Sequence, residues 1–359
     1  MYKTWWQKID YLLLIVMLIL LAYGLIIVYS ANGQEAGPGS EVRRQLLYIF
    51  IGIVLMVVFA SIDYHFLASV ELYLYIINLI LLLAVLAYGK EALGAQRWIS
   101  IGSFSFQPSE FAKIFIIISI SARLSDENAL KFEKLAVTFL YLALPMILIL
   151  KQPDLGTSLV LVSIFFVMLY IRGWNPFLIL GLTAMGLTIS PFVLKEYQKK
   201  RLFVFVDPGM DPTGAGWNLR QSIIGVGSGK LLGKGLFSGT QTQLRFVPEH
   251  SRDFIFTVLC EELGFIGGTF LVTLYFILLF KTVQTAKYSR DLLGTLIATG
   301  IAVLFFFHVF VNIGMTMGIM PITGLPLTFM SYGGSSLISN MMAIGLLLNI
   351  SMRREKFFK

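Results

Sequence analysis

The sequence predicts an all-α polytopic integral membrane protein with about ten transmembrane helices and one large extracytoplasmic loop. Hydrophobic residues make up 57% of the 359 residues and charged residues only 13%, a composition too apolar for a soluble protein. The apolar residues fall in blocks of about 17 to 25, the length of helix that crosses roughly 30 Å of hydrocarbon. One long, more polar interval, residues 195–252, lies between the seventh and the eighth of these blocks.

Each apolar block predicts one membrane-spanning helix, and we expect a single membrane domain over residues 1–359. The ten spans are expected at about 11–29, 46–62, 71–88, 109–124, 135–151, 155–171, 176–194, 254–280, 294–317 and 333–352. Trp5 and Trp6 precede the first block, which suits a retained helix with interfacial anchors better than a cleaved signal. An even number of spans places both termini on one side of the membrane.

The distribution of positive charge predicts that both termini are cytoplasmic, because short cytoplasmic loops carry an excess of Lys and Arg. On that assignment the inside segments hold thirteen: Lys3, Lys8, Arg123, Lys131, Lys134, Arg172, Lys281, Lys287, Arg290, Arg353, Arg354, Lys356 and Lys359. The short outside loops hold five: Arg43, Arg44, Lys90, Arg97 and Lys151. The interval 195–252, between spans seven and eight, then lies outside.

This outer loop is cationic and partly apolar. Its nine basic residues are Lys195, Lys199, Lys200, Arg201, Arg220, Lys230, Lys234, Arg245 and Arg252, against four acids, Glu196, Asp207, Asp211 and Glu249, a net charge of +5. Its aromatic and aliphatic residues argue against disorder, so we expect short amphipathic segments on the outer membrane surface. The positive charge suits an anionic lipid substrate. No nucleic-acid partner is expected, because no soluble basic face is evident.

Three carboxylates mark the eighth span. Asp253 lies at its outer end, where it could cap the helix or take a proton from a substrate hydroxyl at the water–lipid boundary. Glu261 and Glu262 lie roughly 12–14 Å deeper in a regular helix. Carboxylates at such a depth usually face the bundle interior and are paired or functional. We expect these two glutamates to point away from Asp253, in either a structural or a substrate-path role.

Further charged residues precede or begin other spans. In QPSEFAK, Glu110 and Lys113 are spaced i,i+3 and can pair on one helix face; either they only pair, or Lys113 also meets an anionic substrate group. Arg97, in GAQRWISIGSF, could anchor the chain at the interface or contact a phosphate. Asp154, in QPDLGTSLV, suits a cap for the sixth span.

Two glycine-rich stretches could bind anions. The first is MPITGLPLTFMSYGGSS, residues 320–336, whose backbone amides could form an anion nest or only a tight turn. The second, GVGSGKLLGKG, lacks the Walker order; its Lys230 and Lys234 could hold phosphate, or the stretch could serve packing. No metal site is predicted, because Cys260 is the single cysteine and the three histidines lack metal-ligand spacing.

Taken together, these motifs resemble one family. GAQRWISIGSFSFQPSEFAK, QPDLGTSLV, GSGKLLGKGLFSGTQ, PEHSRDFIFTVLCEELGFIGG and PITGLPLTFMSYGGSS occur in the order and spacing of SEDS proteins (shape, elongation, division and sporulation). The resemblance covers nearly the whole chain. DPTGAGWN, GKG and GTQ are more similar to the rod-shape, RodA-like branch than to the division branch. Ser251-Arg252 departs from the His-Thr that usually precedes the family's key aspartate.

The resemblance implies a peptidoglycan glycosyltransferase of the bacterial cytoplasmic (inner) membrane. It would polymerise lipid II on the extracytoplasmic face, for lateral wall elongation and rod shape. The implied partners are lipid II as donor and acceptor, a class B penicillin-binding protein that cross-links the glycan, and other elongation-complex membrane proteins. The family's essential aspartate maps onto Asp253. Its QPSExxK pair maps onto Glu110 and Lys113, and its QPDLG aspartate onto Asp154.

Lipid II chemistry then suggests a mechanism. The sugar–phosphate bond is α and the product link is β-1,4, so one inverting displacement of undecaprenyl diphosphate suffices. Asp253 would be the base for the acceptor hydroxyl. Lys113, Arg97, Arg245 and Lys234 are candidate cations for the departing diphosphate, a task that a divalent cation, Mg²⁺ or Mn²⁺, could share.

Two other functions stay open at this stage. A lipid II flippase would also need many spans, internal charges and a lipid substrate, although transporters usually bind substrate at the midplane. A non-catalytic scaffold for the penicillin-binding protein would not need Asp253.

Overall fold

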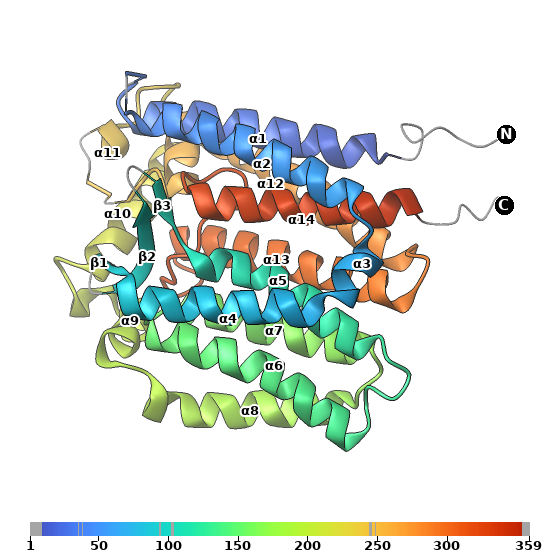
Figure 1. Cartoon of the computed structure of the whole chain (residues 1–359). Coiled ribbons are helices and arrows are strands. Elements are labelled where there is room, and N and C mark those ends of the chain that lie inside the picture. Colours follow the sequence, from blue (N-terminus) through green and yellow to red (C-terminus); the bar gives the residue numbers. More distant parts are fainter. Residues whose placement is uncertain are drawn as a thin grey trace, which may run out of the picture.

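The computed structural model describes residues 9–34, 36–37, 39–92, 95–101, 104–243, 246–247 and 249–353. A helix occupies each of the ten predicted spans (Figure 1): α1 Tyr11–Ala31, α2 Glu41–Ser61, α4 Glu71–Tyr88, α5 Pro108–Leu124, α6 Phe132–Lys151, α7 Leu155–Ile171, α8 Pro176–Val193, α12 Ile255–Lys287, α13 Leu292–Thr316 and α14 Gly334–Arg353. Among the described residues, seven of these are long and apolar enough to cross a membrane on length and composition alone; the other three are α5, α7 and α8. The predicted class, a predominantly helical polytopic membrane fold, is confirmed, whereas the extracytoplasmic placement of the long loop stays a prediction.

Polar residues fix where several helices begin. Asp10 and Asp154 accept hydrogen bonds from backbone amides in the first turns of α1 and α7. Asn175 does the same for α8, which then starts with Pro176. Such caps satisfy amide groups that have no partner inside the helix. The cap predicted at Asp154 is therefore present.

Helix α14 forms the centre of the bundle, and α2 packs along it (Figure 1). Its membrane-length window is entirely buried within the protein. Glycine permits the close approach, because a Cβ atom on Gly345 would lie 2.4 Å from the carbonyl oxygen of Met56 in α2. Helix α8, in contrast, runs along the edge of the bundle and exposes most of its side chains.

A three-stranded antiparallel sheet covers one end of the bundle (Figure 1). Its strands are β1 Lys90–Ala92, β2 Ala95–Ile101 and β3 Phe104–Phe106, in that order. The strands were not predicted: this stretch was expected to be an interfacial anchor or a phosphate contact. The signal was present in ISI (residues 99–101) and FSF (residues 104–106), where apolar and polar residues alternate with the period of a strand. The sheet matters for function because β2 and β3 line a cavity described below.

Short helices make up much of the interval 195–252. They are α9 Glu196–Val206, the 3₁₀ turn η2 Pro208–Met210, α10 Ala215–Ser228 and α11 Thr240–Gln243. Helix α10 packs against α12 and α13. There Ser222 donates a hydrogen bond of 2.8 Å to the Thr316 carbonyl and lies 2.5 Å from the Thr257 hydroxyl. Through α10, the interval 195–252 is thus packed against the transmembrane helix bundle.

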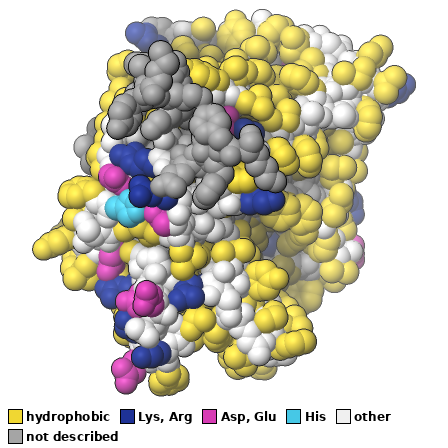
Figure 2. All heavy atoms as spheres, turned by 90° about the vertical axis from the view of Figure 1, so that its right-hand side faces the viewer, with side chains coloured by type: hydrophobic (Ala, Val, Ile, Leu, Met, Phe, Trp, Pro, Cys, Tyr) yellow, Lys and Arg dark blue, Asp and Glu magenta, His cyan; other side chains and the backbone are white. Residues whose placement is uncertain are grey.

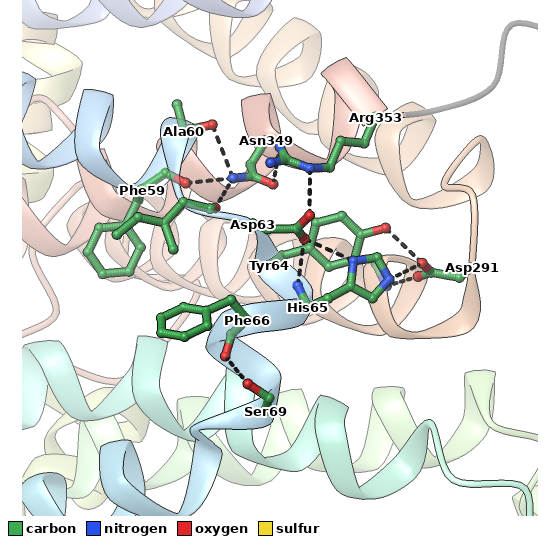
Figure 3. Close-up of polar contacts among 12 residues, drawn as sticks. Phe59, Ala60, Asp63, Tyr64, His65, Phe66, Ser69, Asp291, Asn349 and Arg353 are labelled. Atoms are coloured by element: carbon green, nitrogen blue, oxygen red, sulfur yellow. Dashed lines mark hydrogen bonds and ion pairs between the residues drawn. The ribbon is translucent and has the colours of Figure 1, made fainter.

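A polar network joins three helices at the opposite end (Figure 3). The His65 ring lies 2.9 Å from Asp63 and 2.8 Å from Asp291, and the Tyr64 hydroxyl also donates to Asp291. Arg353, at the end of α14, pairs with Asp63 at 3.1 Å. Because Asp291 also caps α13, the network connects α13, α14 and the short helix α3 (Tyr64–Ser69).

Candidate functional site

A polar cavity of about 380 Å³ lies at the sheet-covered end of the bundle. Its walls come from α2, β2, β3, the turn before α12 and the loop between α13 and α14. The lining residues include Arg44, Tyr48, Trp98, Ser100, Ser105, Gln107, Arg252, Asp253, Gly324, Pro326, Tyr332 and Ser336. Of the carboxylates in the described residues, Asp253 is the one that lines this cavity.

Asp253 belongs to the turn that precedes α12, which begins at Ile255. The cap position is occupied by Phe254, and no side chain caps this helix. The cap interpretation of Asp253 is therefore not what the structure shows. Among the described residues, none hydrogen-bonds to its carboxylate, whereas its backbone carbonyl accepts a 2.9 Å bond from Asn312. The backbone of Asp253 is thus fixed by Asn312, while its side chain lines the cavity.

The surroundings of Asp253 shift its ionisation. Burial is the largest influence and, with the neighbouring Glu249 charge, raises the pKa of Asp253 to about 6, although Arg201, Arg252 and Arg97 oppose the rise. A carboxylate with this pKa is ionised at neutral pH yet is more basic than an ordinary aspartate. These are the properties required of a general base that works near pH 7.

Two arginines line the cavity beside the carboxylate, Arg44 from α2 and Arg252 from the adjacent position. Arg252 pairs with Glu249 at 3.0 Å and its guanidinium lies 5.7 Å from the centre of the Tyr332 ring. Neither arginine was among the predicted substrate-binding residues. Both lie in loops or at helix starts that looked unremarkable in sequence, and only the fold brings them together.

Arg201, from α9, is a third cation near Asp253. Gly324 separates the two side chains: a Cβ atom placed on this glycine would lie 3.3 Å from Oδ2 of Asp253 and 3.9 Å from a terminal nitrogen of Arg201. Gly324 has a φ of +74°, a conformation that glycine adopts without strain. From the sequence, Arg201 was expected only to contribute to the positive charge of the long loop.

The predicted pair Glu110 and Lys113 is present, but it lies behind the cavity wall. Lys113 is fully buried and its Nζ contacts Glu110 at 2.9 Å and the His308 ring at 3.0 Å. The other ring nitrogen of His308 lies 3.0 Å from the carbonyl oxygen of Pro326. The lysine thus reaches the cavity through a chain of contacts that ends on a lining residue. His308 was missed, because a lone histidine in an apolar span carries no signal of its partners.

Arg97 and Asp154 meet outside the cavity. The Arg97 guanidinium donates to the carbonyl oxygens of Gln152 and Pro153 and lies 3.8 Å from Asp154. Asp154 in turn caps α7 and accepts from the Thr157 hydroxyl at 2.9 Å. Together they fasten the sheet to the turn between α6 and α7.

Lys234 lies in a separate polar cluster around α12. Its Nζ contacts Glu261 at 2.6 Å, and Glu261 also accepts from the Thr240 hydroxyl and the Gln241 amide. Glu262 accepts a hydrogen bond from Ser30 of α1. The two glutamates therefore face different neighbours, and neither lines the cavity of Asp253, in agreement with the prediction that both point away from this residue.

The glycine-rich stretch before Lys234 packs against a break in α12. Gly264 has a φ of +64°, and the amides of Phe265 and Ile266 donate to the carbonyls of Lys230 and Leu231. These contacts satisfy amide groups that the interrupted helix leaves without internal partners. Packing is thus the observed role of this stretch. Arg245, another predicted substrate-binding residue, lies outside the described residues.

The donor set near Asp253 does not fit a resident divalent cation. Within the described ranges, no group of three or more His, Cys, Asp or Glu side chains could hold a metal ion. His250 is engaged elsewhere, with ring nitrogens 2.9 Å from the carbonyl oxygens of Val247 and Ala31.

Comparison with known proteins identifies the family of this chain. A protein-family model for the FtsW, RodA and SpoVE proteins, described as "Cell cycle protein", matches residues 10–356. The chain belongs to the FtsW/RodA/SpoVE family. Membership agrees with the SEDS resemblance and, with the long apolar helices, makes the chain a multi-pass membrane protein.

Individual members of the FtsW/RodA/SpoVE family match along almost the whole chain. The peptidoglycan glycosyltransferase MrdB of Escherichia coli K12 is 38% identical, with 99% of this chain and 98% of the relative covered. A solved structure described as "Structural coordination of polymerization and crosslinking by a peptidoglycan synthase complex" matches with a TM-score of 0.81 and 30% identity, covering 97% and 99%. The rod shape determining protein RodA of Thermus thermophilus matches with a TM-score of 0.73 and 29% identity, covering 96% and 97%.

Proposed function

We propose that this protein is a peptidoglycan glycosyltransferase that polymerises lipid II into β-1,4 glycan strands for lateral wall elongation and rod shape. The observation that carries the proposal is the position of Asp253: a carboxylate without a hydrogen bond from any described residue, in a polar cavity at one end of the bundle, with arginines beside it. The chain also shares 38% identity with MrdB over nearly its full length.

In the proposed mechanism, Asp253 is the general base. It accepts the proton of the acceptor sugar hydroxyl as that oxygen attacks the anomeric carbon of the donor. The carbon–oxygen bond to the diphosphate breaks in the same step, so the α linkage becomes β. No covalent enzyme intermediate is needed, and a single well-placed carboxylate is chemically sufficient.

Cationic side chains stabilise the departing undecaprenyl diphosphate, whose negative charge grows as the bond breaks. We assign this task to Arg44 and Arg252, which line the cavity, and to Arg201 beside them. Arginine suits the role because its planar guanidinium can bind phosphate oxygens in pairs. No step is routed through a metal ion.

Lys113 is assigned a positioning role. Its chain of contacts through His308 supports Pro326, which lines the cavity close to Asp253. Arg97 holds the turn at residues 152 and 153 against the sheet that forms another wall. Lys234 acts further away, by neutralising Glu261 at the break in α12.

The membrane topology that we propose follows from the distribution of Lys and Arg in the sequence. Both termini lie in the cytoplasm, and the cavity of Asp253 opens on the extracytoplasmic face of the bacterial inner membrane. A class B penicillin-binding protein would cross-link the product, and other elongation-complex membrane proteins would join them. One solved relative is described as a synthase complex that coordinates polymerisation and crosslinking, which supports a partner of this kind.

Reconstitution tests the proposal. Purified protein in proteoliposomes with lipid II, with and without the penicillin-binding protein, should give a ladder of glycan products on gels. Asp253→Asn, which keeps the size of the side chain, should abolish the ladder without altering the thermal midpoint by more than a few degrees. Lipid II that crosses the bilayer without forming glycan would indicate a flippase. Normal cell shape in cells that carry the Asp253→Asn variant would indicate a scaffold.

A further inference from the structure

The turn before α12 is fastened to the loop that connects α13 to α14. The backbone amide of Tyr332 donates a hydrogen bond of 2.9 Å to the Ser251 carbonyl. The Ser331 hydroxyl donates to the Arg252 carbonyl at 2.5 Å and itself accepts from the amide of Leu327 at 2.8 Å. Two consecutive residues of the turn are therefore held by two consecutive residues of the loop.

Asn312, in α13, joins the same two segments through its side chain. Its Nδ2 donates to the Asp253 carbonyl at 2.9 Å and to the Leu325 carbonyl at 2.7 Å, and the side chain is fully buried. Because both partners are carbonyl oxygens, each takes one of the two N–H groups that an amide nitrogen offers. Residues 251–253 thus each give their carbonyl oxygen to a donor from α13 or from the loop that follows it.

One turn earlier in α13, His308 holds the next carbonyl of the same loop. Its Nδ1 lies 3.0 Å from the Pro326 carbonyl oxygen, and its Nε2 lies 3.0 Å from Nζ of Lys113. A carbonyl oxygen only accepts, so the ring hydrogen is on Nδ1, and Nε2 accepts from the lysine. Residues spaced i,i+4 share one face of a helix. This face of α13 therefore fixes the loop backbone at both Leu325 and Pro326.

The loop fixed in this way forms part of the cavity around Asp253. Gly324, Pro326 and Tyr332 of the loop line this cavity. A Cβ atom placed on Gly324 would lie 3.3 Å from Oδ2 of Asp253, so the carboxylate lies close to the loop backbone. A shift of the turn relative to the loop would move the carboxylate with respect to the cavity walls and to Arg201.

We propose that Asn312 is a positioning residue that fixes the catalytic orientation of Asp253, by holding its backbone in register with the loop between α13 and α14. This inference rests on the assignment of Asp253 as the general base. Asn312 does not line the cavity and takes no part in the proton transfer. Its effect is on orientation, and a displacement of about 1 Å at a reacting group can cost about 10²-fold in rate.

Asn312→Leu tests this role, because leucine is similar in size and shape but has no N–H group. Asn349→Leu is the matched control. Asn349 is also fully buried, and its Nδ2 also donates to backbone carbonyls, among them those of Phe59 at 2.9 Å and Ala60 at 3.0 Å (Figure 3). These contacts lie at the end of the bundle where Figure 2 shows charged side chains gathered, opposite to the cavity of Asp253. Each substitution removes buried N–H donors, but Asn349→Leu does not touch the Asp253 turn.

Infrared titration of the purified full chain measures the effect without substrate. The carboxyl band of Asp253 is identified as the band that Asp253→Asn removes. Burial is the largest influence that raises the pKa of Asp253, so a carboxyl that is displaced toward water should titrate at lower pH. We expect a lower midpoint in Asn312→Leu and the wild-type midpoint in Asn349→Leu. Ser331→Ala removes only the hydroxyl that holds Arg252; it should lower the midpoint by less, and it replaces Asn312→Leu in both assays if that variant does not fold.

Polymerisation kinetics give the second readout. In proteoliposomes with lipid II, Asn312→Leu should lower kcat by about 10–10²-fold, while KM stays close to the wild-type value because the contacts to the substrate are retained. Asn349→Leu should keep both constants. An unchanged kcat or an unchanged infrared midpoint in Asn312→Leu, or an equal loss of kcat in Asn349→Leu, would overturn the positioning role and leave the polymerase assignment intact. Absence of glycan with the wild-type protein would instead refute the polymerase assignment, and the infrared midpoints would still decide whether Asn312 fixes Asp253.

Discussion

If Asp253 is the general base, polymerisation should depend on pH with a midpoint near its raised pKa. With a pKa of about 6, the carboxylate is about 90% ionised at pH 7 and about 10% ionised at pH 5. Because the base must be ionised to accept a proton, the rate at low lipid II concentration should fall about tenfold between these two pH values. At subsaturating substrate, the profile reports the free enzyme.

Two neighbouring variants should move this midpoint in opposite directions. Glu249 raises the pKa of Asp253, so Glu249→Gln should shift the midpoint to lower pH. Arg201 lowers the same pKa, so Arg201→Gln should shift the midpoint to higher pH. The assay is the initial rate of glycan formation by gel, measured from pH 5 to 8 in buffers of constant ionic strength.

The pair of variants separates titration of the enzyme from titration of lipid II, since substrate titration would not respond to either substitution. Asp253→Asn supplies the baseline and should lose about 10²–10⁴-fold in rate, the usual contribution of a general base. A flat profile between pH 5 and 7, or midpoints that stay the same in both variants, would refute the assignment of Asp253 as the base.

Three further predictions concern stability, and each is read from thermal or denaturant unfolding in detergent. Lys113→Met should destabilise by about 3–5 kcal/mol, because it leaves the buried Glu110 carboxylate unpaired; the double variant with Glu110→Gln should recover part of the loss, and no recovery would contradict the pairing. Gly264→Ala should cost more than the about 1–3 kcal/mol of its positive φ, because the added Cβ would also overlap the backbone of Leu231 and Gly233. Gly181→Ala, with open space at its Cβ position, should be neutral or slightly stabilising. Burial raises the pKa of Asp63, but hydrogen bonds and neighbouring cations outweigh burial and hold the pKa of this carboxyl below 3.8. The stabilisation that the Asp63 carboxylate provides is therefore present above pH 3.8 and is lost as the pH falls through its lower pKa in the folded protein. Asp63→Asn should reduce this loss of stability at acid pH.

The membrane spans were predictable because their signal is local. Twenty apolar residues in a row identify a helix that crosses the bilayer whatever the neighbours are. The helix boundaries agree with the predicted spans to within five residues, except that α12 continues to Lys287, beyond the predicted end at residue 280. The sheet over residues 90–106 was missed, although its alternation was readable in the sequence. Two alternating stretches of three residues each, 99–101 and 104–106, are a weak strand signal beside the strong apolar blocks on either side.

The candidate site was only partly predictable, because its partners are distant in the chain. Asp253 stood out as a carboxylate at the end of an apolar run. Lys113 and Arg97 were expected to face the substrate, but their actual partners, His308 for one and backbone carbonyls for the other, come from elements that no spacing rule connects. Arg44 was missed for the same reason, since it reaches the cavity only through the packing of α2 against α14.

The complete enclosure of α14 has a consequence for how the protein is made. This helix carries Ser335, Ser339, Asn340 and Asn349 on a surface that touches only protein, and lipid would be a poor solvent for those groups. In chain order it follows the nine other span helices. The nine helices before it are synthesised first and cannot complete their packing until α14 is inserted among them, so formation of the Asp253 cavity depends on the 20 residues of this one helix.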